Sequence, residues 1–496
     1  MPVLRENPKV SSSISRFLVL AFARVANYAI LLVSPIVFVR ILDQHAYGQY
    51  REFVVYAIAL ATVLGFSVKT SILYFIPKDP DNERKYVTQT ALFIFASSAL
   101  GLGITYATRH IVFAKASFDF AEPLLLYVFF FLNLDFVESY WLAKKRSDYV
   151  LYYSTAKSAI KITVCMAVGY MTRSVEAIVT ALVIFEACKF LVLLCLFSSR
   201  RLFTVTLDMA LIREHLRLVL PFGAGTVLYG LNQQLGKLFT SMTLGPSALA
   251  VYTIGAYQIP IMGVVRSAAG DVLFPDMVQR GQGSPMAGLS LWNRANVLYC
   301  FVVFPFFTLL FFYADTFVTT LFTDQYVVAV PIFRVFLLLM LRQCFEMSTP
   351  LRAMNENRYF MIGNLVAILV NAGFIFATFD NLGLLAAPIA LLVSEVALAV
   401  YLGSRILKVY SIRVRQMLFW NKLMAIALAV LLNVPILLIG ELVPIGDVVR
   451  AIVFSSLFLA GYFVFVRHYR LDEIELLVSR VMRKAGLPRW LKSASS

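Results

Sequence analysis

The chain has 496 residues, of which 60% are hydrophobic and 15% charged, and its mean hydropathy is +0.79. So few charges cannot cover a soluble protein of this length, and the composition therefore predicts that lipid is its solvent. The net charge of +16 would suit nucleic acid, but Lys and Arg concentrate in alternate loops, which argues against such a partner. The five cysteines lie in apolar runs without CxxC spacing, so neither a disulfide framework nor a metal site is predicted.

Apolar segments follow one another along the whole chain, each long enough to cross roughly 30 Å of hydrocarbon. The predicted spans, with boundaries good to about four residues, are 16–40, 52–76, 87–109, 122–142, 150–172, 176–198, 217–242, 248–275, 290–313, 327–350, 359–379, 383–404, 422–441 and 447–467. The predicted fold class is an all-α polytopic membrane protein with about 14 transmembrane helices.

The loops between these spans alternate in basic content. Lys and Arg gather in the N-terminal segment, in 143–149, in 199–216 and in the C-terminal tail, whereas 243–247 and 314–326 hold none. Since basic loops stay on the cytoplasmic side, the pattern predicts that both termini are cytoplasmic and that anionic membrane lipids contact the basic side. The tail has apolar residues at helical spacing, which is typical of an interfacial amphipathic helix.

Two pairs of short segments repeat along the chain. In "LDQHAYGQY" (42–50) and "LGPSALAVY" (244–252), Leu, Ala and Tyr recur at an offset of 202 residues, after the first and seventh spans. "AKKRSDY" (143–149) and "AMNENRY" (353–359) form a second pair at an offset of 210. The pattern predicts two parallel six-helix repeats followed by two further helices.

The repeats predict the following domain division. It comprises an N-terminal six-helix lobe (1–198), a cytoplasmic amphipathic linker (199–216), a C-terminal six-helix lobe (217–410), appended helices (411–467) and a cytoplasmic basic amphipathic tail (468–496). Lobes of this kind typically rock against each other around a site at the middle of the bilayer, which favours transport.

No constellation of residues favours an enzyme. The four histidines, His45, His110, His215 and His468, all lie in loops or at helix ends. The sequence has no phosphate-binding P-loop and no extramembrane segment the size of a catalytic domain. We therefore expect a transporter with no cofactor.

Charged residues within the spans divide into structural and functional candidates. Lys69, Lys237 and Arg294 lie near helix ends, where snorkelling to the interface is the favoured interpretation. Two spacings suggest salt bridges within one helix, Glu186 with Lys189 and Arg342 with Glu346. Asp135 and Glu138 lie near a helix end and are interpreted as partners of neighbouring lysines.

Four cations remain as candidates for a substrate site: Arg24, Arg266, Lys157 and Lys161. Counted from the cytoplasmic ends of their helices at 1.5 Å per residue, the two arginines lie roughly 12–14 Å deep. The lysines share one face of the fifth span at a similar or greater depth. Unpaired cations at one level between two bundles predict an anion site, and guanidinium groups suit phosphate because they bind it bidentately. Tethering of helices by these arginines is the alternative.

Helix-breaking residues indicate where bends lie. Pro35 and Pro221 interrupt the first and seventh spans, and Gly223 and Gly225 follow closely in "PFGAGTVLYG". Such residues loosen a helix near a gate, although close packing of small residues explains them equally well. Asn27, Asn232, Gln233 and Gln234 add polar groups to the same two helices, as a sugar-lined cavity would need.

Taken together, the 6+6+2 arrangement and the L-x-x-x-A-x-x-x-Y and A-x-x-x-x-x-Y motifs resemble bacterial polysaccharide flippases of the multidrug/oligosaccharidyl-lipid/polysaccharide exporter superfamily. The resemblance implies translocation of undecaprenyl-pyrophosphate-linked oligosaccharide across the bacterial inner membrane for O-antigen, capsule or exopolysaccharide synthesis. It also implies alternating access around a cationic cavity, in which Arg24 and Arg266 match the helix positions of arginines in peptidoglycan-precursor flippases. The implied partners are the lipid-linked substrate, membrane lipids and polysaccharide polymerase or export machinery.

Without an ATP site, the implied transport must draw on an ion gradient, the membrane potential or product removal. Glu395, near the middle of its span, and Glu346 are the candidates for coupling to H⁺ or Na⁺.

Three other functions stay open. A multidrug or other small-molecule ion-coupled antiporter of the same fold predicts acidic residues concentrated in one lobe, whereas cations outnumber acids within these spans. A membrane-bound glycan polymerase or acyltransferase predicts a large outer loop or an intramembrane histidine. A non-transporting scaffold of a polysaccharide assembly complex is separated from a flippase only by an activity assay.

Overall fold

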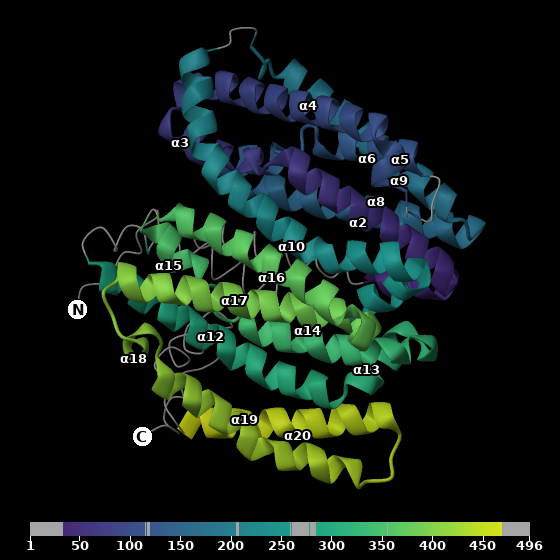
Figure 1. Ribbon diagram of the computed structural model, residues 1–496, viewed down its shortest axis with the longest axis vertical. Coiled ribbons are helices and arrows are strands. Elements are labelled where there is room, and N and C mark those ends of the chain that lie inside the picture. The colour runs from purple at the N-terminus through teal and green to yellow at the C-terminus, as the bar shows by residue number, and fades with distance from the viewer. Residues whose placement is uncertain are drawn as a thin grey trace, which may run out of the picture. The chain divides into compact units, whose positions relative to one another are not determined.

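The computed structural model describes residues 33–114, 116, 120–204, 208–257, 259, 277, 284–354 and 356–468. Within these residues the secondary structure is helical, with no strand (Figure 1). The helices are α2 (Gln44–Gly65), η1 (Val68–Thr70), α3 (Ile72–Lys78), η2 (Pro80–Asn82), α4 (Glu83–Ala107), α5 (Arg109–Val112), α6 (Ala121–Leu132), α7 (Val137–Ala143), α8 (Ser147–Thr172), α9 (Val175–Ser199), α10 (Met209–Gly255), α12 (Pro285–Phe312), α13 (Ala314–Phe322), η3 (Asp324–Ala329), α14 (Val330–Arg342), α15 (Ser348–Ala353), α16 (Asn357–Leu382), η4 (Gly383–Leu385), α17 (Ala386–Val409), α18 (Val414–Met417), α19 (Trp420–Glu441) and α20 (Asp447–His468).

Many of these helices are long and apolar enough to cross a membrane. The described residues contain eight such segments, or nine if α2 and the bent continuation Val68–Lys78 count as one span. Large apolar side chains point outward from several of them; Leu100 is 69% exposed and Phe376 is 74% exposed. Outward-facing apolar side chains of this kind suit lipid contact. The predicted all-α polytopic fold is confirmed, whereas the count of fourteen spans stays a prediction.

Two predicted spans are broken near their middles. After α2 ends, Phe66 and Ser67 adopt left-handed backbone conformations (φ 44° and 53°), and η1 then begins at an angle of 56°. The span 122–142 divides into α6 and α7, with Leu134 also left-handed (φ 63°). Such breaks expose backbone groups that must find other partners, and they bring polar side chains into the bundle. Asn133, at the second break, donates hydrogen bonds to the Phe129 carbonyl at 2.8 Å and to Ser98 Oγ at 3.0 Å.

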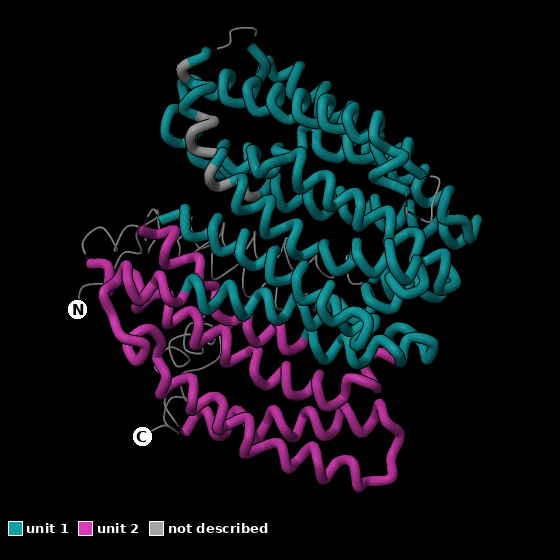
Figure 2. Tube along the Cα trace, viewed as in Figure 1, with its two compact units in different colours: residues 1–268, 321–336, 356–402 teal, residues 269–320, 337–355, 403–496 magenta. Residues whose placement is uncertain are grey.

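The chain divides into two compact units, coloured in Figure 2. Unit 1 comprises residues 1–268, 321–336 and 356–402, and unit 2 comprises 269–320, 337–355 and 403–496. In unit 2, α12 packs against α19, and the Asn293 side chain donates to the Met417 carbonyl at 2.9 Å. The predicted division into lobes, linker, appended helices and tail stays a prediction.

In unit 1, α2 and α10 lie side by side (Figure 1). Glycines allow this close approach: a Cβ on Gly230 would lie 2.5 Å from Thr62 Cγ2, and one on Gly48 would lie 2.0 Å from the Pro246 carbonyl oxygen. Small residues at helix contacts are typical of membrane bundles, where the packing of side chains replaces the hydrophobic effect.

The first pair of repeated motifs meets at this contact. Gln44 Nε2 donates to the Ser247 carbonyl at 3.1 Å, which joins the segment 42–50 to the segment 244–252. The motifs also begin alike. Asp43 caps α2, and Gly245, 202 residues later, is the residue where α10 leaves helical geometry (φ 80°). Both positions lie outside helical geometry, and the internal repeat itself stays a prediction.

Candidate functional site

The predicted site lies only partly within the described residues. Arg24 and Arg266 lie outside them, and so does Asn27. Their predicted role in an anion site therefore stays a prediction. Lys157 and Lys161 both lie on α8, within unit 1.

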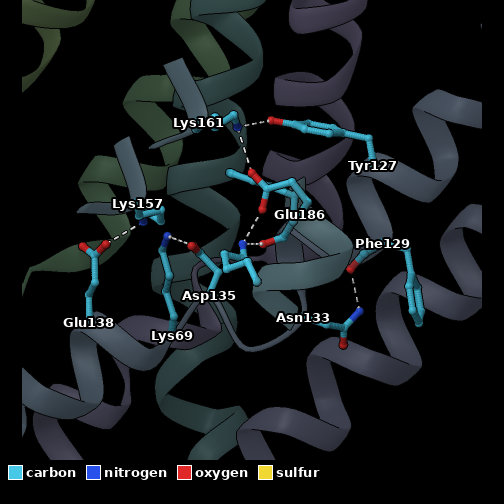
Figure 3. Close-up of polar contacts among 11 residues, drawn as sticks. Lys69, Tyr127, Phe129, Asn133, Asp135, Glu138, Lys157, Lys161 and Glu186 are labelled. Atoms are coloured by element: carbon cyan, nitrogen blue, oxygen red, sulfur yellow. Dashed lines mark hydrogen bonds and ion pairs between the residues drawn. The ribbon is translucent and has the colours of Figure 1, made fainter. Parts of the chain in front are cut away.

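Both lysines belong to a network of ion pairs contributed by neighbouring helices (Figure 3). Lys157 Nζ lies 2.6 Å from a Glu138 carboxylate oxygen, and Lys161 Nζ lies 2.8 Å from one of Glu186. Glu186 holds a second cation, since Lys189 Nζ lies 2.5 Å from its other oxygen. Two carboxylates of α7 and α9 thus hold three lysines of α8 and α9.

The broken spans contribute a further pair. Lys69, in η1 after the break of α2, contacts Asp135, in the break between α6 and α7, at 2.7 Å. Because both residues lie where a span is interrupted, the breaks allow the half-exposed Lys69 side chain to reach the largely buried Asp135. Aromatic side chains also contact the lysines of this network. Tyr127 Oη lies 2.8 Å from Lys161 Nζ, and Lys157 lies over the Tyr153 ring.

The network corrects one prediction and confirms two others. Lys157 and Lys161 are not unpaired, as the sequence analysis assumed, because each has a carboxylate partner on another helix. The predicted bridge between Glu186 and Lys189 is confirmed, as is the interpretation of Asp135 and Glu138 as lysine partners. Lys69 pairs with Asp135 while about half exposed, and its interpretation as a snorkelling residue stays a prediction. Sequence spacing could not reveal these partners, since they lie on different elements.

Two cations outside the predicted substrate site, Arg51 and the lysine interpreted as snorkelling, Lys237, lack a carboxylate partner among the described residues. The Arg51 Nε atom on α2 is buried without a hydrogen-bond partner. Lys237 on α10 has only a 3.4 Å contact to Gln234 Oε1, and the charged group acting on it is Arg51. Tyr50, beside Arg51, lies within electrostatic range of Arg51 and Lys161. Two like charges on packed helices repel each other unless an anion compensates them.

Position explains why these cations were missed. Arg51 lies at the edge of a predicted span and Lys237 near the end of another, where solvation by water or headgroups is the ordinary interpretation. One feature of the sequence could have identified Arg51 and Lys237: both lie near the repeated motifs 42–50 and 244–252, and the structure brings these two motifs into contact.

A second polar cluster joins α10, α16 and α17 within unit 1. Gln233 Nε2 donates to a Glu395 carboxylate oxygen at 2.7 Å, and Glu395 is 1% exposed. Asn371 Nδ2 donates to Asn232 Oδ1 at 2.8 Å, and Asn232 Nδ2 contacts Ser394 Oγ at 3.2 Å. Glu395, predicted for ion coupling, thus lies with the predicted polar residues Asn232 and Gln233. Its coupling role stays a prediction.

Glu346 has a different setting, in unit 2. Its carboxylate accepts a hydrogen bond from Ser348 Oγ at 2.6 Å, at the start of α15. Polar contacts of this kind satisfy the exposed donors of a helix start. The predicted coupling role of Glu346 stays a prediction.

The predicted bend residues lie in helical backbone. Pro35 falls in the helical residues 33–41, and Pro221 lies within α10. A Cβ on Gly223 would lie 2.4 Å from a Phe66 ring carbon, and one on Gly225 would lie 2.7 Å from a Phe360 ring carbon. Both glycines therefore allow close packing, and their predicted gating role stays a prediction.

Comparisons with solved structures agree with this fold. The lipid II flippase MurJ in an inward closed conformation matches with a TM-score of 0.71 at 11% identity, covering 93% of this chain and 100% of that one. The Vibrio cholerae MATE transporter VcmN matches with a TM-score of 0.56 at 11% identity, covering 80% and 97%. The eukaryotic MATE transporter AtDTX14 matches with a TM-score of 0.57 at 14% identity, covering 80% and 96%. No curated protein matches the sequence.

These likenesses show that the chain has the polytopic helical fold of MurJ and of these MATE transporters. Residues 37–331 match the family described as polysaccharide biosynthesis protein, which is more than half of the chain. The chain belongs to this family, and the resemblance drawn from its repeats is confirmed at the level of family and fold.

Proposed function

We propose that the protein is a flippase that moves undecaprenyl-pyrophosphate-linked oligosaccharide repeat units across the bacterial inner membrane by alternating access. The product would serve exopolysaccharide, O-antigen or capsule synthesis, in company with polymerase or export machinery. Both termini would be cytoplasmic. The carrying observation is the pair Arg51 and Lys237, two cations with no carboxylate partner among the described residues, in a family of polysaccharide biosynthesis proteins.

The chemistry of this pair supports a phosphate ligand. A buried charge without a partner of opposite charge is strongly destabilising. A bundle that keeps Arg51 and Lys237 without carboxylate partners is therefore stabilised by a ligand of negative charge. A guanidinium binds phosphate through two parallel hydrogen bonds, and an ammonium adds a point charge. A pyrophosphate linked to a lipid matches both, because its tail can stay in the bilayer while its charge enters the bundle.

The order of cations along the predicted spans suggests a path. Arg24 and Arg266 are expected about 12–14 Å from the cytoplasmic side, and Lys161 about 16 Å from it. Lys237 is expected about 30 Å from that side, and Arg51 immediately precedes the second span at its outer end. Cations at successive depths would offset the cost of desolvating the pyrophosphate throughout the crossing.

Energy for the cycle would come from an ion gradient or the membrane potential. One charge moved through 100 mV gains about 2.3 kcal/mol, which is enough to bias a cycle. Glu395, buried with amide and hydroxyl groups on three helices, is the group we assign to H⁺ or Na⁺ coupling.

The first experiment is complementation of a deletion strain with the wild type or with Arg51→Ala, Lys237→Ala, Arg24→Ala or Arg266→Ala.

Surface polysaccharide and the sidedness of the prenyl-linked glycan are the readouts. We expect the four variants to accumulate glycan on the cytoplasmic leaflet at normal protein levels, whereas Lys78→Ala, which removes an exposed pair with Glu214, exports normally. Normal export by Arg51→Ala and Lys237→Ala would refute the anion site. An ion-coupled small-molecule antiporter, the alternative favoured by the MATE-like fold, would instead leave polysaccharide unchanged and alter drug efflux in the deletion strain.

A further inference from the structure

The ion-pair network of unit 1 contains one cation too many. Its lysines are Lys69, Lys157, Lys161 and Lys189, whereas its carboxylates are those of Asp135, Glu138 and Glu186. Lys69 and Asp135 form one pair, and Lys157 and Glu138 form another. The remaining carboxylate, Glu186, holds both Lys161 and Lys189, so four lysines face three acids.

Burial distinguishes the two lysines that share Glu186. The Lys189 side chain is 6% exposed and lies nearer, at 2.5 Å, with a second contact of 3.4 Å to the Phe131 carbonyl. The Lys161 side chain is 24% exposed and lies at 2.8 Å. If Lys161 moved away, Glu186 would keep Lys189 as its counter-ion, and no buried carboxylate would be left uncompensated.

The other contacts of Lys161 are with Tyr127 and Phe131 of α6, and Tyr127 in turn packs against α2. The Lys161 ammonium lies 2.8 Å from Tyr127 Oη, and the Tyr127 ring packs against Phe53 of α2 with centroids 5.3 Å apart. Phe53 lies two residues after Arg51 on α2, so the surplus lysine is linked through Tyr127 to the part of α2 that carries Arg51.

We propose that Lys161 is an exchangeable phosphate ligand, which contacts Glu186 in the resting protein and moves to the substrate's phosphate during transport. This inference rests on the proposed function. Glu186 and Lys189 form the permanent pair, and Lys189 acts as a positioning residue because it frees Lys161 without touching substrate. When no substrate is bound, Lys161 contacts Glu186. By returning to Glu186 at the end of the crossing, Lys161 can also release the substrate's phosphate, as a transport cycle requires.

The test uses the full-length protein in lipid nanodiscs. Undecaprenyl pyrophosphate is the probe, and undecaprenol is its uncharged control. The variants are Lys161→Met, Lys189→Met, the double variant, and Lys69→Met as a control for loss of a lysine elsewhere in the network. Affinity is measured by titration, and folding is checked by gel filtration and thermal unfolding.

We expect Lys161→Met to weaken pyrophosphate binding about tenfold or more, through loss of a charge-assisted hydrogen bond. We expect Lys189→Met to weaken it by a similar factor, since Glu186 then retains Lys161 as its sole counter-ion. The double variant leaves buried Glu186 without a lysine; where it passes the folding check, it should bind no more weakly than Lys161→Met. Lys69→Met should bind as the wild type does. Lys161→Met and Lys189→Met each leave Glu186 one lysine and leave three lysines facing three acids, so both should fold. Lys189→Met is the deciding variant, because a fixed ligand at Lys161 would not respond to it.

Each contrary outcome has a distinct meaning. Wild-type affinity in Lys189→Met would overturn the exchange, leaving Lys161 at most a fixed ligand. Wild-type affinity in Lys161→Met would remove this residue from the site while the proposed function stood. If the wild type binds undecaprenyl pyrophosphate no better than undecaprenol, the proposed function fails and this inference fails with it.

Discussion

Substitution of Gly48 tests the closest approach between α2 and α10. A Cβ at this position would lie 2.0 Å from the Pro246 carbonyl oxygen and 2.4 Å from its carbon. Ordinary contact begins at 3.4 Å, so Gly48→Ala must separate the two backbones by roughly 1.4 Å. Overpacking of this kind costs about 1–3 kcal/mol, and no rotamer change relieves it because the obstructing atoms belong to the backbone.

Gly103 on α4 is the matched control, because a Cβ there would meet nothing within 4 Å. Replacing glycine by alanine inside a helix gains about 0.5–1 kcal/mol at both positions, since Gly48 lies in α2 and Gly103 in α4, so the two variants should differ by the overpacking cost alone, about 1–3 kcal/mol. Thermal unfolding of both purified variants in the same detergent is the assay, with Gly48→Ala expected to melt several degrees below Gly103→Ala. Equal melting temperatures would refute the close approach.

Three further predictions concern polar groups. Asn371→Leu should lower stability by about 1–3 kcal/mol, because it removes the donor to the buried Asn232 Oδ1, whereas Asn381→Leu at an exposed position of the same helix should not. Comparable melting temperatures of the two variants would contradict this. Asp43→Ala should cost about 1 kcal/mol by removing the cap on Ala46 N, and Asp43→Asn should restore most of it, as measured by thermal unfolding. Glu395→Gln should abolish the dependence of flipping in proteoliposomes on a Na⁺ or H⁺ gradient, whereas Glu441→Gln, which changes an exposed carboxylate, should retain this dependence. Ion dependence that survives in Glu395→Gln would exclude Glu395 as the coupling group.

Part of the candidate site was predictable from local spacing. Glu186 and Lys189 are three residues apart on one helix, so their bridge follows from helical geometry. Glu395 was identifiable because a carboxylate near the middle of a span is costly and therefore informative. By contrast, the partners of Lys157 and Lys161 lie on α7 and α9, and no spacing rule connects residues on separate helices.

The sequence by itself determined the membrane environment, the helical class and the position of the motif repeat. Hydropathy and periodicity are local properties of the sequence. They determine which segments span the bilayer, since every spanning helix must form its backbone hydrogen bonds within itself. Only the tertiary structure decided which charges compensate one another. The breaks near Phe66 and Leu134 bring Lys69 to Asp135, and the packing of α2 on α10 brings Arg51 toward Lys237. Charge compensation acts over a few ångströms in space whatever the distance along the chain, so it becomes visible only once the helices are packed.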